Sequence, residues 1–362
     1  MSVAIFLFRS GRRERIDARG PSEFLYGYAE LARDGAPVRM IEESELGLGS
    51  TWPRVLEAVA NRIATVAGVH ARVLLAVFRN RHVLAAGGTL VATTHTMGLA
   101  LAALRRLGLH MPDLVIMTMG LVSPETSPLR RRWFGWILSG TTLATLSKPE
   151  AAWLRQTLGL GGVRVVDFAF GVDLDFWQPG DGAHGDTVLS VGNDWNRDFA
   201  TLVAAWRPEF PTLEIVTSLP ISSDKPNVRI LRGDWRSQVI SDTALRAKIQ
   251  GSRLVVVPVR DTLQPSGQSA ALQAMACGKP VVMSANRGCW DTEMLQRYDA
   301  CRFVPPGNVQ ALSETIATLL ADTPNAEAMG ARARRMLESE DVSCEAMAAQ
   351  FRILVPPLGR SI

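Results

Sequence analysis

The sequence predicts an α/β protein of two domains, each built on a parallel sheet. Three observations support this class: the chain has 362 residues, short apolar runs alternate with helical stretches along it, and the alternation starts again near its middle. A chain of this length exceeds what one hydrophobic core usually serves. Strands that alternate with helices form βαβ units, whose sheets are parallel and covered on both faces.

The first half opens with an apolar run, Val3–Phe8, which ends in a basic loop and predicts a buried strand. Ser22 is a suitable N-cap for a helix whose apolar side chains share one face, and Asp34-Gly35 ends that helix. A second helical stretch covers Gly98–Leu107. Further strands are predicted at Val38–Ile41, Val73–Phe78, Thr89–Thr93, Leu114–Met117 and Leu143–Leu146.

The second half repeats this pattern after Phe168-Ala169-Phe170-Gly171. The last helix, about Ser343–Leu354, carries apolar side chains on one face and must pack on another element. Helices are also predicted at Phe199–Trp206, Ala244–Gln250 and Ser269–Ala276, and strands at Val188–Val191, Leu213–Val216, Val228–Leu231, Leu254–Val257 and Pro280–Met283.

The composition is that of a soluble globular protein, with 47% hydrophobic and 20% charged residues. No uncharged stretch approaches the roughly 20 residues of a membrane span, and the first apolar run is too short for a signal peptide. Four cysteines occur, but they form no CxxC pair and have no histidine cluster nearby. This pattern indicates neither a zinc site nor a redox motif, and it favours reduced thiols in the cytoplasm.

The net charge is +4, and the basic excess lies in residues 1–170. A basic half can attract phosphate, an anionic membrane surface or an acidic substrate, or it can simply form a solvated surface. Gly47-Leu48-Gly49 lacks the third glycine and the preceding strand of a dinucleotide motif. A nicotinamide cofactor is therefore not expected.

The most informative stretch is Pro258–Met283, in which a turn-forming segment enters a helix that Gly278 ends. Small residues at a helix start let backbone N–H groups and the helix dipole meet a phosphate. A helix start capped without any ligand has the same composition. Gln273 lies on the same helix, where its amide can bind a ribose hydroxyl. The residues expected to hold a pyrophosphate are Ser266, Gly267, Gln268 and Ser269.

This stretch resembles the nucleotide-sugar loop of glycosyltransferase family 4, the retaining GT-B enzymes of the glycosyl transferases group 1. The family pattern is a Glu, seven residues, a second Glu and then Ala-Met-Ala-Cys-Gly-Lys-Pro-Val. Gln273–Val281 matches it except that Gln replaces the second Glu. Three further stretches agree with the family: Ser147–Glu150 with Val163–Phe176, Val188–Gly192 and Ala92–His95. The resemblance covers most of residues 1–340 and is more specific in the second half.

The resemblance implies the GT-B fold, with two Rossmann-like domains facing each other across a cleft and a C-terminal helix crossing back. We expect an acceptor-binding domain in residues 1–168, a nucleotide-sugar-binding domain in 169–340, and a helix of 341–362 that packs on the first domain. The implied activity is transfer of a hexose-type sugar, with retention, from a UDP- or GDP-linked donor to a lipid, glycan or small-molecule acceptor. No cofactor and no nucleic-acid partner is expected.

The resemblance also assigns site residues. Arg197 stands near the family's phosphate-binding Lys and would stabilise the leaving diphosphate with help from Lys279 and without a metal. His95 would position the sugar or the acceptor, and a buried structural histidine is the alternative. The remaining assignments are Gln273 and Gln264 for the ribose and donor sugar, Gly233, Asp234 and Trp235 for the base, and Gly171 and Asp173 for a loop at the cleft.

Two glutamates of the family are replaced in this chain. Gln273 stands for the second, and the position eight residues earlier is Pro265, where the family has the Glu that contacts the donor sugar. A GT-B nucleotide-sugar epimerase and a non-catalytic nucleotide-sugar-binding protein are therefore the alternatives to a transferase.

A basic and aromatic segment, Pro128–Leu138, places Arg130, Arg131 and Arg132 against Trp133 and Trp136. Such residues favour a membrane interface, where indole rings lie at headgroup level and arginines meet anionic lipid. An internal helix with one solvated face is the alternative. The protein is accordingly expected in the cytoplasm, either dissolved or peripheral at the inner face of the membrane.

Overall fold

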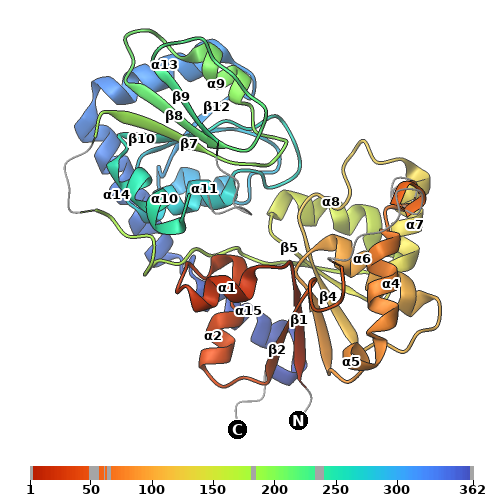
Figure 1. The fold of residues 1–362 in the computed structure, drawn as a ribbon. Coiled ribbons are helices and arrows are strands. Elements are labelled where there is room, and N and C mark those ends of the chain that lie inside the picture. The colour runs from red at the N-terminus through yellow and green to blue at the C-terminus, as the bar shows by residue number, and fades with distance from the viewer. Residues whose placement is uncertain are drawn as a thin grey trace. The chain divides into compact units, whose positions relative to one another are not determined.

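The computed structural model describes residues 3–48, 57–60, 62, 67–180, 185–232 and 240–358. The chain divides into two compact units, of which unit 1 comprises Met1–Phe170 with Glu345–Ile362, and unit 2 comprises Gly171–Cys344. Each unit is built on a six-stranded sheet with helices on both faces (Figure 1). Both sheets are parallel throughout, so the predicted α/β class is confirmed.

The sheet of unit 1 has the strand order β2-β1-β3-β4-β5-β6. The chain moves from β1 to β2 on one side and then to β3 on the other, so the order reverses between β1 and β3. In open α/β sheets, ligands bind outside the carboxyl ends of the strands at such a reversal. The strands are β1 (Ala4–Phe8), β2 (Val38–Glu42), β3 (Thr89–Ala92), β4 (Asp113–Thr118), β5 (Thr142–Thr145) and β6 (Arg164–Asp167).

The helices of unit 1 cover both faces of this sheet (Figure 1). One face buries Ile5, Leu7 and Leu90 against α4 and α6 in a single hydrophobic core. The helices are α1 (Arg12–Asp17), α2 (Tyr28–Arg33), α4 (Ala71–Arg79), α5 (Arg81–Ala85), α6 (His95–Arg106), α7 (Pro128–Ile137), α8 (Lys148–Leu158) and α15 (Cys344–Leu354), with 3-10 turns at Glu23–Leu25, Gly159–Gly161 and Pro356–Leu358.

The other face of the sheet is closed by the last helix, α15. The ring of its Phe351 lies 5.1 Å from the ring of Phe6 and 4.7 Å from that of Phe168, and Phe351 is fully buried. Gly27 lets the helix approach, because a Cβ at that position would overlap the backbone of Ala348. The apolar face expected on this helix therefore packs within unit 1.

Two local expectations for unit 1 are wrong. Val73–Phe78 is not a strand but lies inside α4, where the buried residues follow helical spacing, and a short apolar run does not distinguish the two by itself. Ser22 does not open one continuous helix. Left-handed backbone at Tyr26 and Gly27 separates a 3-10 turn from α2, and the Ser22 hydroxyl donates to Glu30 instead of capping.

The sheet of unit 2 has the strand order β12-β11-β10-β7-β8-β9. The first strand, β7, is central, and the order reverses between β7 and β10, as in a dinucleotide-binding fold with two halves of three strands each. The strands are β7 (Thr187–Val191), β8 (Thr212–Thr217), β9 (Val228–Arg232), β10 (Leu254–Val257), β11 (Val281–Ser284) and β12 (Arg302–Val304).

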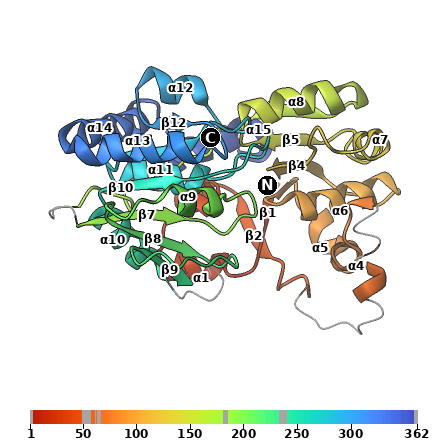
Figure 2. The same ribbon diagram turned by 90° about the horizontal axis from the view of Figure 1, so that it is seen from above.

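Two layers of helices cover this second sheet. One face packs against α9 and α13 in a core that includes Val188, Val256 and Ile316. On the other face α11 packs beside α14 (Figure 2), where Gly330 allows the backbone at Gly278 to come close. The helices are α9 (Phe199–Ala205), α10 (Asp242–Gly251), α11 (Gln268–Ala276), α12 (Thr292–Arg297), α13 (Val309–Ala321) and α14 (Thr323–Ser339).

No helix in the described parts of the chain combines the length and the hydropathy required to cross a membrane.

Candidate active site

Two loops of unit 2 are joined at the carboxyl ends of β7 and β10, where the strand order reverses. The backbone N–H of Arg260 donates to the carbonyl of Asn196 at 2.8 Å, and a β-bridge pairs Arg197 with Val259. Because β7 and β10 are neighbours in the sheet, this pairing holds residues 192–198 against residues 258–267. The fold therefore brings together the two stretches that the sequence singles out for phosphate binding.

Arg197 is a buried cation in this pair of loops. Its side chain is 3% exposed, and its Nε donates to Asp194 Oδ2 at 2.8 Å. A Cβ on Gly192 would overlap the guanidinium, and a Cβ on Gly267 would lie 3.2 Å from Nη1, so the group fits between two glycines. Among the residues that the structure describes, Nη1 has no hydrogen-bond partner. A buried N–H without a partner is costly, and an anionic ligand at this position would satisfy it.

The N-terminus of α11 lies beside this guanidinium and lacks a side-chain cap. Its N-cap is Gly267, with φ of 83°, which has no side chain to accept from the first turn. The first N–H groups of a helix otherwise need an acceptor, and a phosphate can supply it. The other helices of unit 2 do have side-chain caps, which are Asp198 for α9, Ser241 for α10, Asp291 for α12, Asn308 for α13 and Asp322 for α14.

The loop before α11 is held by a residue that the sequence analysis missed. Asn196 donates through Nδ2 to Gln264 Oε1 at 3.1 Å and to Ser266 Oγ at 2.9 Å. Gln268 is buried, and its Nε2 has no hydrogen-bond partner within the described residues. Ser269 follows it in the first turn and is half-buried. The position of Asn196, directly before Arg197 in a polar loop after a strand, was the available signal.

Lys279 does not join this site, which corrects its assignment to the donor phosphates. Its backbone N–H donates to the carbonyl of Ala274 at the carboxyl end of α11. That helix has 9 residues and rises about 1.5 Å per residue, so its two ends lie about 13 Å apart. Burial lowers the pKa of Lys279, and Cys277 and Glu327 oppose this shift. Gln273 is buried in the body of the same helix.

Gly171 and Asp173 shape the start of unit 2. A Cβ on Gly171 would overlap the carbonyl of Ser343, to which the neighbouring Val172 is bridged. Asp173 Oδ1 accepts from the N–H of Phe176 at 2.9 Å and so closes a turn. No cluster of three potential metal ligands occurs among the described residues. Gly233, Asp234 and Trp235, expected at the base, lie outside the residues that the structure describes.

His95 lies at the corresponding reversal of the sheet in unit 1. It is the first residue of α6, directly after β3, and Thr94 caps the helix by accepting from Met97. Thr93 binds the carbonyl of Leu7 through both its N–H, at 3.1 Å, and its hydroxyl, at 2.8 Å, which ties the ends of β3 and β1 together. Burial lowers the pKa of His95, followed by the charges of Arg9 and His70. A neutral imidazole therefore lies within electrostatic reach of Arg9, in the basic loop that follows β1.

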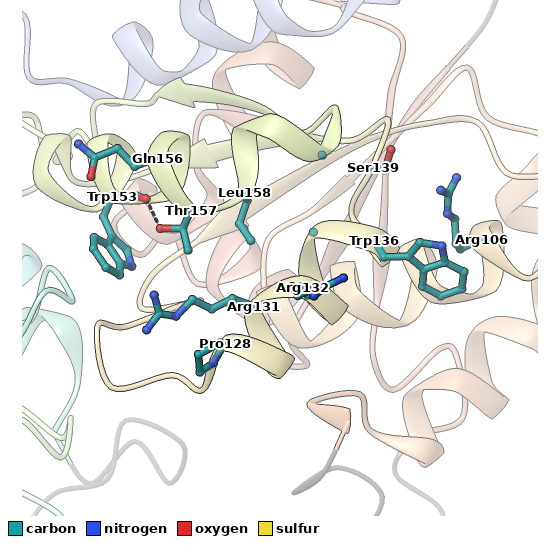
Figure 3. Close-up of a pocket in the computed structure, with 12 residues that line it drawn as sticks. Arg106, Pro128, Arg131, Arg132, Trp136, Ser139, Trp153, Gln156, Thr157 and Leu158 are labelled. Atoms are coloured by element: carbon teal, nitrogen blue, oxygen red, sulfur yellow. Dashed lines mark hydrogen bonds between the residues drawn. The ribbon is translucent and has the colours of Figure 1, made fainter.

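Unit 1 also has a pocket of about 700 Å³ between α7 and α8 (Figure 3). Arg131 lies over the ring of Trp153 and donates to the carbonyl of Thr126 at 2.7 Å, and Arg106 lies over the ring of Trp136 (Figure 3). The pocket's lining thus joins cations to indole rings.

The exposed side of α7 is apolar as well as basic. Leu129, Trp133 and Trp136 are 80%, 37% and 43% exposed, and their spacing places them on one side of the helix. The two indole rings stack with centroids 5.2 Å apart. The buried side holds Phe134 and Ile137. The other apolar side is partly exposed: the Trp133 indole N–H donates to the carbonyl of Ala67 at 2.9 Å, and Arg106 lies over the ring of Trp136.

Comparison with known proteins finds a family model that matches part of this chain and solved structures that share its fold. Residues 186–322 match the model of the family Glycosyl transferases group 1. Sucrose-phosphate synthase of Thermosynechococcus elongatus superposes with a TM-score of 0.72 at 22% identity, covering 99% of each chain. HepE of Anabaena, solved in complex with UDP-glucose, has a TM-score of 0.68 at 16% identity, covering 98% of this chain and 100% of its own.

A glycosyltransferase of Rickettsia africae has a TM-score of 0.66 at 12% identity, covering 100% of both chains. No curated protein matches the sequence significantly. The resemblance noted in the sequence is confirmed: the chain has the GT-B fold, and its residues 186–322 match the family model of the glycosyl transferases group 1.

Proposed function

We propose that this protein transfers a hexose-type sugar, with retention, from a nucleotide-sugar bound by unit 2 to an acceptor bound by unit 1. The observation that carries the proposal is the buried Nη1 of Arg197 beside the uncapped start of α11. The group 1 domain supports glycosyl transfer, and the UDP-glucose complex of HepE supports a UDP-linked donor.

The proposed reaction depends on stabilising the leaving group. The bond between the anomeric carbon and the phosphate oxygen breaks, and the diphosphate gains negative charge. Arg197 Nη1 and the first N–H groups of α11 lie where they can bind that charge, and preorganised donors of this kind lower the barrier. A phosphate oxygen then accepts the proton of the acceptor hydroxyl while the new bond forms on the same face, which retains configuration. Neutral His95 positions a sugar hydroxyl.

A thermal-shift panel with UDP, GDP, UDP-glucose and GDP-mannose tests donor binding. At about 100 times Kd, a ligand of the native state adds about 2.7 kcal/mol to stability, so the matching nucleotide should raise Tm by several degrees. Arg197→Ala should lose this rise. Arg229→Ala, which removes an exposed cation from β9 of the same unit, is the matched control. A wild-type protein that no nucleotide stabilises would contradict the proposal.

A second candidate function is nucleotide-sugar binding or epimerisation without transfer. Gln273 and Pro265, where the family has glutamates, favour it because neither side chain supplies a carboxylate. Incubation with the stabilising nucleotide-sugar separates the three activities. A transferase should release some free sugar slowly, an epimerase should yield an isomerised nucleotide-sugar, and a binding protein should yield neither.

For the partner of unit 1 we propose the anionic inner surface of the membrane, with the protein otherwise cytoplasmic. The support is the exposed stripe of Leu129, Trp133 and Trp136 on α7, next to the exposed Arg132, since indole rings and arginines favour the headgroup layer. An acceptor in that membrane would be a lipid or a polysaccharide precursor.

Vesicle flotation tests this surface. The protein should float with vesicles that contain phosphatidylglycerol and much less with phosphatidylcholine alone. Arg130→Glu/Arg132→Glu should abolish flotation, whereas Arg229→Glu should not. Arg131 is left in place because its guanidinium holds the carbonyls of Thr126 and Pro124. Flotation that the double variant leaves unchanged would refute the membrane proposal.

A further inference from the structure

We infer that unit 1 binds a phosphoryl group at the reversal between β1 and β3, through Arg9 and Arg12 and beside His95. Naming the ligand as the acceptor rests on the proposed function, but the phosphoryl site itself does not. The acceptor would then be a phosphorylated sugar or a phosphate-bearing lipid, which share this chemistry.

The loop that carries these arginines has a fixed backbone. The Glu42 carboxylate accepts from the N–H groups of Gly11 at 3.3 Å, Arg12 at 2.6 Å and Arg13 at 2.7 Å. Gly11 has φ of 86°, a left-handed conformation that glycine adopts without strain. Glu42 is the last residue of β2, which runs parallel to β1 with Phe8 opposite Glu42. The loop that follows β1 is therefore held at the carboxyl edge of the sheet.

Several positive charges gather at this edge. Arg12 and Arg15 lie over the ring of Phe24, with Cζ 5.3 Å and 5.4 Å from its centroid. Burial lowers the pKa of Arg12, the charges of Arg15 and Arg9 lower it further, and Tyr26 and Glu23 oppose the shift. Glu23 is thus the carboxylate that offsets this group of cations in part.

Arg9 has no offsetting partner among the residues that the structure describes. It is exposed, and it makes no hydrogen bond or ion pair there. Its charge reaches His95 as well as Arg12 and Tyr26. Like charges held close together are unfavourable, and a dianion would turn this repulsion into attraction. Arginine pairs with phosphoryl oxygens through two parallel N–H donors, which suits an exposed guanidinium without a partner.

His95 gives the site its second recognition element. Its pKa is lowered, so the ring is neutral near pH 7 and can both accept and donate a hydrogen bond. The site therefore offers cations for a phosphoryl group and a neutral ring for a nearby hydroxyl. An acceptor sugar that carries both groups fits this combination, whereas a neutral glycan offers no anionic group to the exposed Arg9.

The test measures phosphate binding with the unit 2 site removed. In an Arg197→Ala background, inorganic phosphate is titrated while the NMR signal of the His95 ring is followed, and that signal is assigned by its loss in His95→Asn. We expect a saturable shift. Adding Arg9→Ala should weaken phosphate about tenfold to a hundredfold, the range for one charge-assisted pair.

Two further variants make the titration specific. Arg9→Lys should recover part of the affinity, and Arg39→Ala, which removes an exposed cation from the body of β2, should change it less than about twofold. A shift that is absent in the Arg197→Ala background, or an equal loss with Arg39→Ala, would overturn the site. This titration tests the phosphoryl site separately from the proposed function. If the proposed function is wrong, the wild type fails to bind any nucleotide in the thermal-shift panel, whatever the phosphate titration shows.

Competition then identifies the source of the phosphoryl group. Glucose 6-phosphate should displace inorganic phosphate if the natural ligand is a soluble sugar phosphate, whereas vesicles containing phosphatidic acid should displace it if the ligand is a lipid. Glucose should not compete in either case. Displacement by glucose as strong as that by glucose 6-phosphate would also overturn the inference.

Discussion

The two sheets of this protein reverse their strand order in the same way, yet the cations at the two reversals are held differently. In unit 2, Arg197 is buried between two glycines and paired with Asp194. In unit 1, Arg9 is exposed and has no ion pair among the described residues. A buried, oriented guanidinium suits a ligand part that never varies, such as a diphosphate. An exposed guanidinium can change its side-chain conformation to bind ligands of different size. The difference teaches that one strand plan can serve both a rigid and an adaptable anion site.

The largest effect is expected from adding a methyl group beside each site. A Cβ on Gly192 would overlap the guanidinium of Arg197, whereas a Cβ on Gly11 would meet no atom within 4 Å. Gly192→Ala should therefore displace Arg197 and weaken UDP binding about a hundredfold. Gly11→Ala should leave phosphate binding by unit 1 within a few-fold and cost about 1 kcal/mol of stability through its left-handed backbone. Calorimetric titration measures the affinity of Gly192→Ala for UDP and of Gly11→Ala for phosphate. Equal losses of affinity in the two variants would contradict the difference between the units.

The second prediction uses pH to separate the units. Burial raises the pKa of Glu150 in unit 1 to about 7, against hydrogen bonds from the N–H groups of Leu121 and Gly120. Because the folded pKa exceeds the ordinary value, the protonated form stabilises the fold at low pH, and this contribution is lost as pH rises through 7. Wild type should lose about 2 kcal/mol relative to Glu150→Gln between pH 5 and pH 8.

Chemical denaturation at the two pH values checks this expectation. The control is Glu125→Gln in the loop between β4 and α7, where the carboxylate is exposed and lies in the same unit. A stability difference between wild type and Glu150→Gln that does not change with pH would contradict the raised pKa.

The third prediction concerns the ion pair that distinguishes unit 2. Asp194→Asn keeps a hydrogen-bond acceptor for Arg197 Nε but removes the opposite charge. The unliganded protein should lose about 1–2 kcal/mol, because a buried cation is left without a countercharge. UDP should then raise Tm more than in the wild type, since its phosphates replace the lost charge. A rise no larger than that of the wild type would show that Asp194 does not hold Arg197 for the ligand.

The smallest effect is expected from loosening the unit 1 loop. Glu42→Gln weakens the acceptor for the N–H groups of Gly11, Arg12 and Arg13. Phosphate affinity should fall only a few-fold, because the cations themselves remain and an adaptable site tolerates movement. A loss as large as that of Arg9→Ala would mean that unit 1 also depends on a fixed geometry, and the comparison between the units would fail.

Local patterns in the sequence predicted unit 2 closely from β7 to β11, whereas α12, β12, α13 and α14 were not predicted. Its predicted strands and helices, such as Leu254–Val257 and Ser269–Ala276, agree with the structure to within two residues. There the apolar runs are short and bounded by Gly, Pro and Asp. In unit 1 the run Val73–Phe78 was misassigned because its length suits a strand as well as a helix, and only the packing of α4 on α6 decides between them.

The site was predictable where neighbours in sequence are neighbours in space. Ser266, Gly267 and Gln268 follow one another at the start of α11, so their position could be predicted from a turn before a helix. Lys279 could not be placed in this way, since the length of the helix separates it from Gly267. The support from Asn196 and Glu42 comes through side chains that cross between loops or strands, and no local pattern reports such contacts.

The interrupted course of the chain through unit 1 has a consequence for its biosynthesis. Residues up to Phe170 leave the ribosome first, but the surface of Phe6 and Phe168 stays open until Phe351 of α15 is made. All of unit 2 is synthesised in between and has every strand of its own sheet before unit 1 is complete. The unit that starts first is therefore the one that finishes last, and a nascent chain stopped before residue 345 presents an unfinished aromatic surface to chaperones.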